Sequence, residues 1–184
     1  MKKVNVYLAD GFEEIEAVTV IDVLRRAEVE VKTVSVSDNK EVTGAHGITV
    51  KADALLGAFD NAEADMLMLP GGMPGTKNLE NSRELKEVIK TFMEKGKYVA
   101  AICAAPSILG KMGLLNGVKA VCFPGFEQYL SGAKLGSDIV VQDGNIITSK
   151  GPGTAIYFAL KLVELLKGKD VAEELRKGMI VQGD

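Results

Sequence analysis

The strongest constraint on the fold is a regular alternation of short apolar runs with segments of helical periodicity along the whole chain. The run at 4–8 is apolar without a polar face, which is typical of a parallel strand covered on both sides. Strands alternating with helices form parallel βαβ units. We therefore predict an α/β fold with a doubly wound, mostly parallel sheet and helices on both faces. Strands are predicted at 4–8, 29–36, 66–69, 98–102, 118–122, 139–141 and 146–148, and helices at 13–27, 82–95, from 106, 151–166 and from 170.

Turn and cap residues define several boundaries of these elements. Asp143-Gly144 predicts a tight hairpin, and residues 41–51 form a small β excursion with glycines at its turn. Either Asn81 or Ser82 can cap the helix that follows, and Asp170 is expected to cap the last one.

Length and composition place the chain among globular proteins. Its 184 residues fit one domain, 1–184, and a hydrophobic content of 47% supplies a sizeable core. A net charge of −3 with interspersed signs gives no reason to expect nucleic acid or a membrane surface as partner. The apolar runs are shorter than the roughly 20 residues that span a bilayer. No export signal is visible, so we expect a cytoplasmic protein.

The cysteine and histidine counts exclude several kinds of site. Cys103 and Cys122 are too few for a disulfide scaffold, and a single histidine, His46, leaves too few ligands for structural zinc. Neither a P-loop nor a G-x-G-x-x-G fingerprint is present. We expect no metal and no cofactor.

Chemistry-bearing residues follow three of the predicted strands, at 11–16, 70–75 and 103–106. In doubly wound sheets the functional site lies at the carboxyl ends of the strands. We therefore expect these three segments to meet at one place.

Cys103 lies between a buried strand and a helix that has Pro106 in its first turn. This strand-to-helix elbow predicts an outward-pointing side chain, and the helix N-terminus should lower the pKa of the thiol. The alternative is a buried structural cysteine, which is the interpretation we adopt for Cys122.

Three carboxylates, those of Glu13, Glu14 and Glu16, lie in the first turns of the first helix. For Glu13 and Glu14 a favourable interaction with the helix dipole is a sufficient explanation. Glu16 is predicted to face inward beside Cys103, where burial would raise its pKa and keep it protonated. A neutral carboxyl could donate a hydrogen bond to the thiolate or move a proton.

Backbone donors complete the predicted site. The N–H groups of Gly72, in the Pro70-Gly71-Gly72 turn, and of Ala104 could form an oxyanion hole, although a plain tight turn remains the alternative. No histidine follows Cys103, so a Cys–His pair with a downstream histidine is excluded.

The elbow at 100–106, the Pro-Gly-Gly turn at 70–72, the acidic run ending at Glu16 and the segment 150–154 occur together and in this order. This set closely resembles the ThiJ/PfpI superfamily, on the branch of the Parkinsonism-associated protein deglycase and bacterial YajL-like proteins. The resemblance implies a flavodoxin-like, class I glutamine amidotransferase-like domain that forms a homodimer. It also implies that Cys103 is the nucleophile and redox-sensitive thiol, that Glu16 is the protonated glutamate beside it, and that Gly72 and Ala104 are the backbone donors.

Several other positions of the chain match the family pattern or depart from it. Arg25 and Arg26 match arginines on the first helix, one of which approaches the partner's site, and His46 stands where close relatives carry an arginine. These three are candidate substrate or anion contacts. Phe123 replaces a histidine that many members place near the nucleophile, and Ala104 replaces the histidine of the protease branch, which argues against peptidase activity. Glutaminase activity fails on the missing downstream histidine.

Two functions remain open. Members of the family are described as glutathione-independent glyoxalases, deglycases, chaperones and oxidative-stress protectors, and some carry an old thiamine-biosynthesis label. The first hypothesis is a glyoxalase or deglycase in which Cys103 attacks a small α-oxoaldehyde to give a hemithioacetal. The second is a non-catalytic redox sensor and chaperone switched by oxidation of Cys103. The expected small-molecule partner is accordingly an aldehyde or an oxidant.

Overall fold

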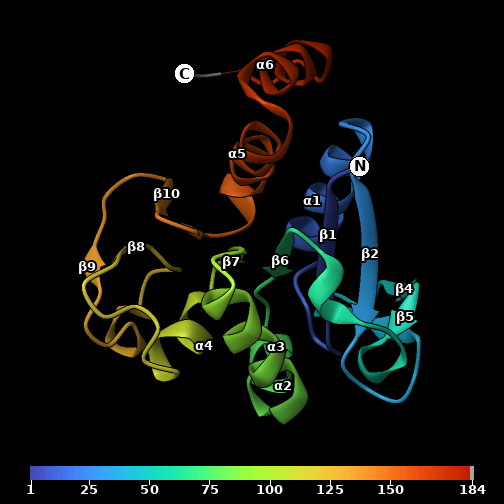
Figure 1. The fold of residues 1–184 in the computed structure, drawn as a ribbon, viewed down its shortest axis with the longest axis vertical. Coiled ribbons are helices and arrows are strands. Elements are labelled where there is room, and N and C mark those ends of the chain that lie inside the picture. The colour runs from blue at the N-terminus through green and yellow to red at the C-terminus, as the bar shows by residue number, and fades with distance from the viewer. Residues whose placement is uncertain (183–184) are drawn as a thin grey trace.

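The computed structural model describes residues 1–182, so the last two residues of the predicted domain, 183 and 184, lie outside it. Its centre is a seven-stranded sheet in the order β10-β11-β7-β6-β1-β2-β5, in which every neighbouring pair is parallel except β10 and β11 (Figure 1). The strands are β1 (Lys3–Leu8), β2 (Glu30–Ser35), β5 (Ala54–Leu55), β6 (Met66–Leu69), β7 (Tyr98–Ile102), β10 (Val140–Asp143) and β11 (Ile146–Ser149). The predicted doubly wound, mostly parallel α/β fold is confirmed.

Helices cover both faces of this sheet (Figure 1). Helices α1 and α5 pack against each other on one face with α6 beyond them, and α2, α3 and α4 lie on the other. Their bounds are α1 (Glu14–Arg26), α2 (Gly75–Asn81), α3 (Arg83–Glu94), α4 (Pro106–Lys111), α5 (Ala155–Lys167) and α6 (Lys169–Gly178). Short 3₁₀ turns are formed by Leu56–Ala58, Asn61–Glu63, Glu127–Tyr129 and Pro152–Thr154.

The side chains of β1 explain why its sequence lacks a polar face. Val4, Val6 and Leu8 enter the core shared with α1 and α5, whereas Tyr7 enters the core on the opposite face. A strand buried on both sides contributes to two cores at once.

Several local predictions are settled by the structure. The Asp143-Gly144 hairpin joins β10 to β11 as predicted, and Ser82 is the cap of α3, its hydroxyl accepting a hydrogen bond from the N–H of Leu85 at 3.2 Å. Gly168 occupies the cap position of α6, so the prediction of Asp170 as cap is wrong by two residues. Asp170 lies instead in the first turn, where its negative charge interacts favourably with the helix dipole.

The predicted strand 118–122 does not join the main sheet. Only β8 (Lys119–Ala120) is formed, and it pairs with β9 (Lys134–Leu135). The N–H of Val121 donates to the hydroxyl of Thr148 at 3.0 Å, so a side chain satisfies the backbone where a strand would have continued. A third sheet pairs β3 (Glu41–Thr43) with β4 (Thr49–Lys51), which is the predicted β excursion.

Strand order determines where a site can form. From β1 the chain goes outward to β2 on one side and returns to β6 on the other. The crevice at the carboxyl ends of β1 and β6 is therefore the topological switch point, where ligands bind in sheets of this type.

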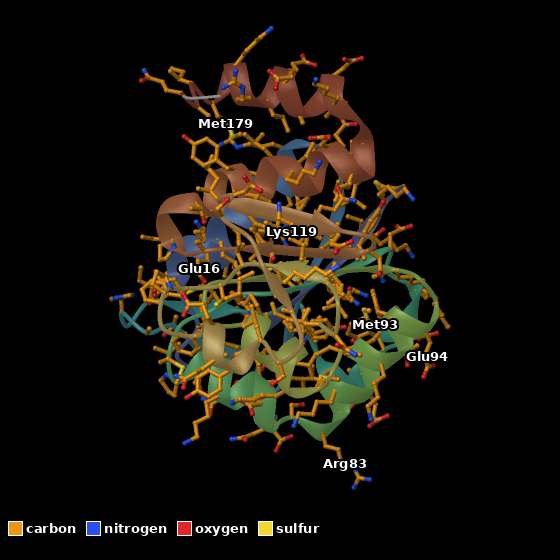
Figure 2. All side chains as sticks on the ribbon, turned by 90° about the vertical axis from the view of Figure 1, so that its left-hand side faces the viewer. Glu16, Arg83, Met93, Glu94, Lys119 and Met179 are labelled. Carbon is orange, nitrogen blue, oxygen red and sulfur yellow. The ribbon has the colours of Figure 1, made fainter. Side chains whose placement is uncertain are left out.

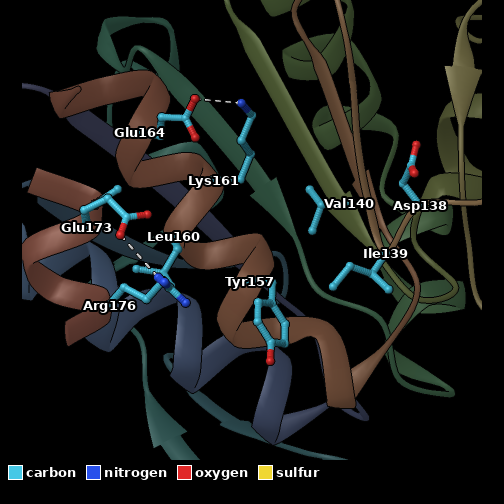
Figure 3. Close-up of a pocket in the computed structure, with 10 residues that line it drawn as sticks. Asp138, Ile139, Val140, Tyr157, Leu160, Lys161, Glu164, Glu173 and Arg176 are labelled. Carbon is cyan, nitrogen blue, oxygen red and sulfur yellow. Dashed lines mark hydrogen bonds and ion pairs between the residues drawn. The ribbon is translucent and has the colours of Figure 1, made fainter. Parts of the chain in front are cut away.

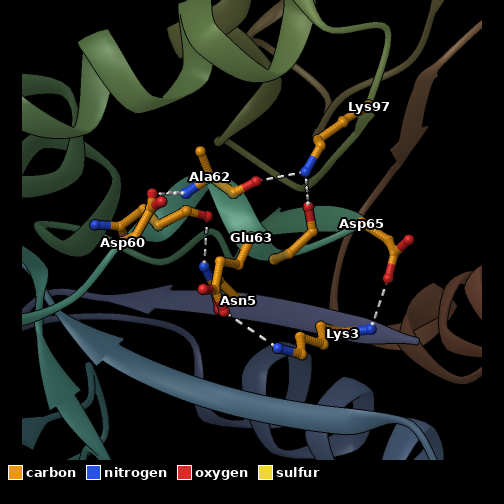
Figure 4. A network of polar contacts seen from close by, with 9 residues as sticks. Lys3, Asn5, Asp60, Ala62, Glu63, Asp65 and Lys97 are labelled. Atoms are coloured by element: carbon orange, nitrogen blue, oxygen red, sulfur yellow. Dashed lines mark hydrogen bonds and ion pairs between the residues drawn. The ribbon is translucent and has the colours of Figure 1, made fainter. Parts of the chain in front are cut away.

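A network of polar contacts lies at the opposite end of the sheet, where β1, β6 and β7 begin (Figure 4). The ammonium group of Lys97 donates to the carbonyl oxygens of Ala62 and Ala64, and the backbone N–H of Lys3 donates to the carboxylate of Asp65 at 2.8 Å. These bonds hold the segment before β6 against the starts of β1 and β7. Among the described residues, no helix combines the length and the apolar character that crossing a bilayer requires.

Candidate active site

The three segments that follow β1, β6 and β7 meet at Gly71. Its N–H donates to Oε2 of Glu16 at 2.7 Å. A Cβ built on Gly71 would lie 2.6 Å from Cβ of Cys103, 3.0 Å from its Sγ and 2.9 Å from Oε2 of Glu16. Glycine is therefore required here, and the predicted convergence of the strand ends is confirmed. In Figure 2 Glu16 lies within the fold, whereas the side chain of Arg83 projects from the surface.

The backbone of Cys103 has the conformation expected of an elbow. Its φ of 64° lies in the left-handed region, which non-glycine residues occupy at a cost of about 1–3 kcal/mol. The N–H of Cys103 donates to the carbonyl of Ser149 at 3.0 Å, and its carbonyl accepts from the N–H of Phe123 at 2.8 Å. The last residue of β11 and the loop after β8 thus hold the strained residue in place.

The elbow turns Cys103 inward rather than outward. The residue is only 8% exposed, so the prediction of an outward-pointing side chain is wrong. Gly71 and the carboxyl of Glu16 occupy the space in front of the sulfur.

Glu16 lies in the first turn of α1 and is fully buried. Burial raises the pKa of Glu16 to about 7, against the opposing effect of the hydrogen bonds from Gly71 and Cys103. The direction agrees with the prediction from sequence. At neutral pH the site therefore exchanges a proton readily at this carboxyl.

The pKa of the Cys103 thiol is raised to about 12, first by burial and then by the charge and hydrogen bond of Glu16. The prediction of a lowered pKa is wrong for this pair. The backbone N–H groups favour the thiolate, but the adjacent carboxylate and the absence of water outweigh them. The pair therefore consists of a thiol that donates its hydrogen bond to an ionisable carboxylate.

The N–H groups of Gly72 and Ala104 both bond to the sulfur of Cys103. Gly72 has a φ of 89°, and a Cβ on it would lie 2.4 Å from the backbone nitrogen of Glu13. Only glycine fits this position, which a tight turn also requires, so that alternative stays open. The role of Gly72 and Ala104 as oxyanion donors stays a prediction.

Arg25 and Arg26 lie in the last turn of α1, far from Cys103 within one chain. Arg25 lies nine positions after Glu16 on the helix, which is about 14 Å along the axis. Arg25 contacts Asp53 at 3.3 Å, and Arg26 pairs with Asp22 at 2.7 Å. Within one chain neither arginine meets the site.

His46 lies in the turn between β3 and β4, against the start of α1. Its Nδ1 is 2.8 Å from Oε2 of Glu14 and 3.7 Å from Oε2 of Glu13. The hydrogen bond to Glu14, followed by the charges of both carboxylates, raises the pKa of His46. These two negative charges already surround the imidazole, which leaves a role in anion binding unsupported.

Two cavities of the molecule differ in their relation to the site. One of about 280 Å³ lies between α2 and α4, and the hydroxyl of Ser107 in its wall donates to the carbonyl of Ala104 at 2.6 Å. A larger one, of about 640 Å³, lies between β10, α5 and α6 and is shown in Figure 3. None of the residues lining the larger cavity belongs to the cluster around Cys103, so its size does not make it the reactive site.

Cys122 is buried in the core on the α3 side, as the sequence predicted.

Comparison with known proteins identifies the relatives of the chain. The DJ-1/PfpI family model matches residues 2–165. Protein DJ-1 homolog B of Arabidopsis thaliana is 41% identical over 183 residues; the match covers 98% of this chain, which spans only 42% of that relative's length. The glutathione-independent glyoxalase DJR-1.2 of Caenorhabditis elegans is 35% identical over 167 residues, with 90% and 88% of the two chains covered.

Solved structures extend the likeness to three dimensions. The structure of oxidized Toxoplasma gondii DJ-1 superposes with a TM-score of 0.94 at 42% identity, covering 98% of each chain. This agreement includes the flavodoxin-like sheet, whose strands β6 and β7 end just before Gly71 and Cys103. The chain belongs to the DJ-1/PfpI family.

Proposed function

We propose that the protein is a glutathione-independent glyoxalase or deglycase that acts on small α-oxoaldehydes or their adducts. The observation that carries the proposal is the buried pair of Glu16 and Cys103, since one point beside Gly71 lies 2.9 Å from Oε2 of Glu16 and 3.0 Å from Sγ of Cys103. Burial raises the pKa of this carboxyl to about 7. A carboxyl that titrates near neutral pH is suited to general base and general acid catalysis. The C. elegans relative bears the name of such an enzyme.

The first step uses this pair directly. Ionised Glu16 accepts the proton of the Cys103 thiol as the sulfur attacks the aldehyde carbon, and the product is a hemithioacetal. The oxygen of the former aldehyde takes up negative charge during the attack. The N–H groups of Gly72 and Ala104, already directed at the sulfur, would stabilise that charge until the oxygen is protonated.

The later steps need no electron carrier. Glu16 moves a proton from the carbon bearing sulfur to the neighbouring carbonyl carbon, and the hydroxyl proton passes to the oxygen of that carbonyl. The hemithioacetal thereby becomes a 2-hydroxy thioester. Water then cleaves the thioester, releasing the 2-hydroxy acid and regenerating the thiol. One carbon is oxidised and its neighbour is reduced within the same molecule, so the sum is addition of water to the α-oxoaldehyde.

The surroundings of the sulfur favour a small substrate. Phe123 and Met73, which are 42% and 53% exposed, flank the segments that hold Cys103 and Gly72, and they provide apolar contact. No histidine is available near the thiol in the described chain, since His46 is bonded to Glu14. Glu16 is therefore the residue that we assign to proton transfer.

Turnover of methylglyoxal to lactate tests the proposal, with wild-type protein compared with Cys103→Ala, Glu16→Gln and the control Cys122→Ser. We expect no turnover with Cys103→Ala and a loss of about 10²–10⁴-fold with Glu16→Gln, the usual range for a general base. Cys122→Ser should retain the wild-type rate because Cys122 is a core residue. Equal rates for wild type and Cys103→Ala would refute an enzymatic role.

A second candidate function, a redox sensor and chaperone, is favoured by one specific observation. Oε1 of Glu16 is buried and has no hydrogen-bond partner among the described residues. An oxygen added to Sγ of Cys103 could accept a hydrogen bond from this position when Glu16 is protonated, which would stabilise a sulfinate. Mass spectrometry after mild peroxide treatment should then find the sulfinate on Cys103 before Cys122. Glu16→Gln should shift the product toward the irreversible sulfonate.

The homodimer is also proposed rather than observed. Ile15 and Val18 on α1 are 56% and 46% exposed, and Ile48 in the β3–β4 turn is 57% exposed. Burying these three side chains against a second copy would remove them from water and could bring Arg25 or Arg26 to the partner's site. Sedimentation should give a dimer for wild type and a monomer for Val18→Asp.

We also propose a cytoplasmic location, because the reducing cytoplasm keeps thiols such as the two free cysteines reduced. Fractionation of cells should find the protein there.

A further inference from the structure

The turn between β3 and β4 places the single histidine of the chain against two buried carboxylates. Glu13 and Glu14 are 8% and 6% exposed, whereas His46 faces solvent. One ligand atom of each residue lies within 4.8 Å of the corresponding atoms of the other two. The three groups come from two segments more than thirty positions apart, so only the docking of the turn creates this cluster.

Glu14 is held firmly within the cluster. Its Oε1 accepts from the backbone N–H of His46 at 2.7 Å, and its Oε2 lies 2.8 Å from Nδ1 of the same residue. A Cβ on Gly44 would lie 2.3 Å from the carboxyl carbon of Glu14, so the turn has glycine where the carboxylate enters. One oxygen is thus fixed by the backbone and the other is directed at the imidazole.

Glu13 has the opposite character. Its carboxylate receives no hydrogen bond from any of residues 1–182, although nine-tenths of the side chain is buried. Its one close polar contact is Nδ1 of His46 at 3.7 Å, which is beyond hydrogen-bond length. The Glu13 carboxylate therefore has oxygens available for coordination beside the imidazole, and a cation bound there would neutralise its charge.

We propose that Glu13, Glu14 and His46 form a binding site for a divalent transition-metal ion, with Zn²⁺ as the ion that fits best. Ligand atoms at about 2.0–2.1 Å from tetrahedral zinc lie about 3.3 Å from each other. The distances of 2.8 and 3.7 Å from Nδ1 to the two carboxylates lie on either side of that value, so small side-chain rotations suffice. An imidazole nitrogen with two carboxylate oxygens favours Zn²⁺ over Mg²⁺, which prefers oxygen ligands alone.

The surroundings match what metal ligands require. The backbone bond to Oε1 of Glu14 orients the ligand oxygen, as outer hydrogen bonds do at zinc sites. The ion would replace the proton shared by Glu14 and His46 and would neutralise Glu13. Three protein ligands leave a fourth position to water, and the bound ion would fasten the β3–β4 turn to the start of α1.

Equilibrium dialysis against Zn²⁺ near neutral pH tests the site on the full chain. We expect one equivalent bound to wild type and affinities lower by at least about tenfold for Glu13→Gln and His46→Asn. Glu41→Gln removes a carboxylate from β3 of the same hairpin, outside the cluster, and should bind as wild type does. Cys103→Ser and Cys122→Ser should also retain the ion.

Thermal unfolding supplies an independent measurement. Zn²⁺ should raise the Tm of wild type and of Glu41→Gln, because an ion that binds only the folded state stabilises it. It should leave the Tm of His46→Asn unchanged, and since His46 is exposed that variant should fold. Zinc binding that survives both Glu13→Gln and His46→Asn, or that disappears with Cys103→Ser, would overturn the assignment, as would no binding to wild type.

Discussion

Glu16→Gln tests the central electrostatic feature of the site, because it removes the ionisable group and keeps an oxygen that can accept from the N–H of Gly71. In the folded protein the pKa of Glu16 is about 7, compared with an ordinary value of 4.5. The folded state therefore binds this proton more tightly than the unfolded state does. The stability that follows is fully present below pH 4.5 and is lost as the pH rises to about 7.

The magnitude follows from the difference between the two pKa values. A difference of about 2.5 corresponds to about 3 kcal/mol, since one pKa unit is about 1.4 kcal/mol. Wild type should lose up to this amount of unfolding free energy between pH 4 and pH 8 through Glu16, and Glu16→Gln should not. The difference in unfolding free energy between the variant and wild type should thus change by about 3 kcal/mol between pH 4 and pH 8, in favour of the variant at the higher pH.

Urea unfolding of both proteins at a series of pH values between 4 and 8 measures this difference. Staying below pH 9 avoids the range in which the thiol of Cys103, whose pKa is raised from 9.0 to about 12, also contributes. Glu94→Gln on α3 is a suitable control because its carboxyl is exposed and far from the site. A stability difference between Glu16→Gln and wild type that does not change with pH would refute the raised pKa, and with it the proposed proton transfer.

Three further predictions concern the thiol, the contact glycine and a helix cap. In Glu16→Gln the midpoint of Cys103 alkylation by iodoacetamide should fall by about 1–3 pH units, because the repelling charge is gone; a rise would show instead that protonated Glu16 stabilises the thiolate. Gly71→Ala should abolish methylglyoxal turnover and lower the unfolding free energy by about 1–3 kcal/mol, because the added Cβ meets Cys103 and Glu16. The control Gly153→Ala should change neither turnover nor stability, because the space around Gly153 is open. Ser82→Ala should lower the unfolding free energy by about 1 kcal/mol through the lost cap of α3, and turnover should be unchanged.

The strand order of the main sheet was not predicted from sequence, but its class was. Alternation of buried runs and helical periodicity requires parallel βαβ units, and parallel strands place their carboxyl ends on one edge. The meeting of Glu16, Gly71 and Cys103 follows from that rule alone. Local signals also predicted the Asp143-Gly144 hairpin and Ser82 as one of two possible caps.

Elements held by distant contacts were predicted less well. The apolar run at 118–122 contains β8 only at Lys119–Ala120, because Thr148 from another strand takes the hydrogen bond of Val121. Helix α2 was not predicted, since its seven residues are too few to show a helical period.

The identity of the reactive residue was determined by sequence, whereas its chemical state was decided by tertiary structure. A cysteine between a buried strand and a helix with proline in its first turn marks an elbow. Whether that elbow exposes the thiol depends on Gly71 and Glu16, which come from other strand ends and bury Cys103 to 8% exposure. Desolvation and charge act through space, and for this reason the raised pKa of Cys103 and the cluster of Glu13, Glu14 and His46 appear only in the folded molecule.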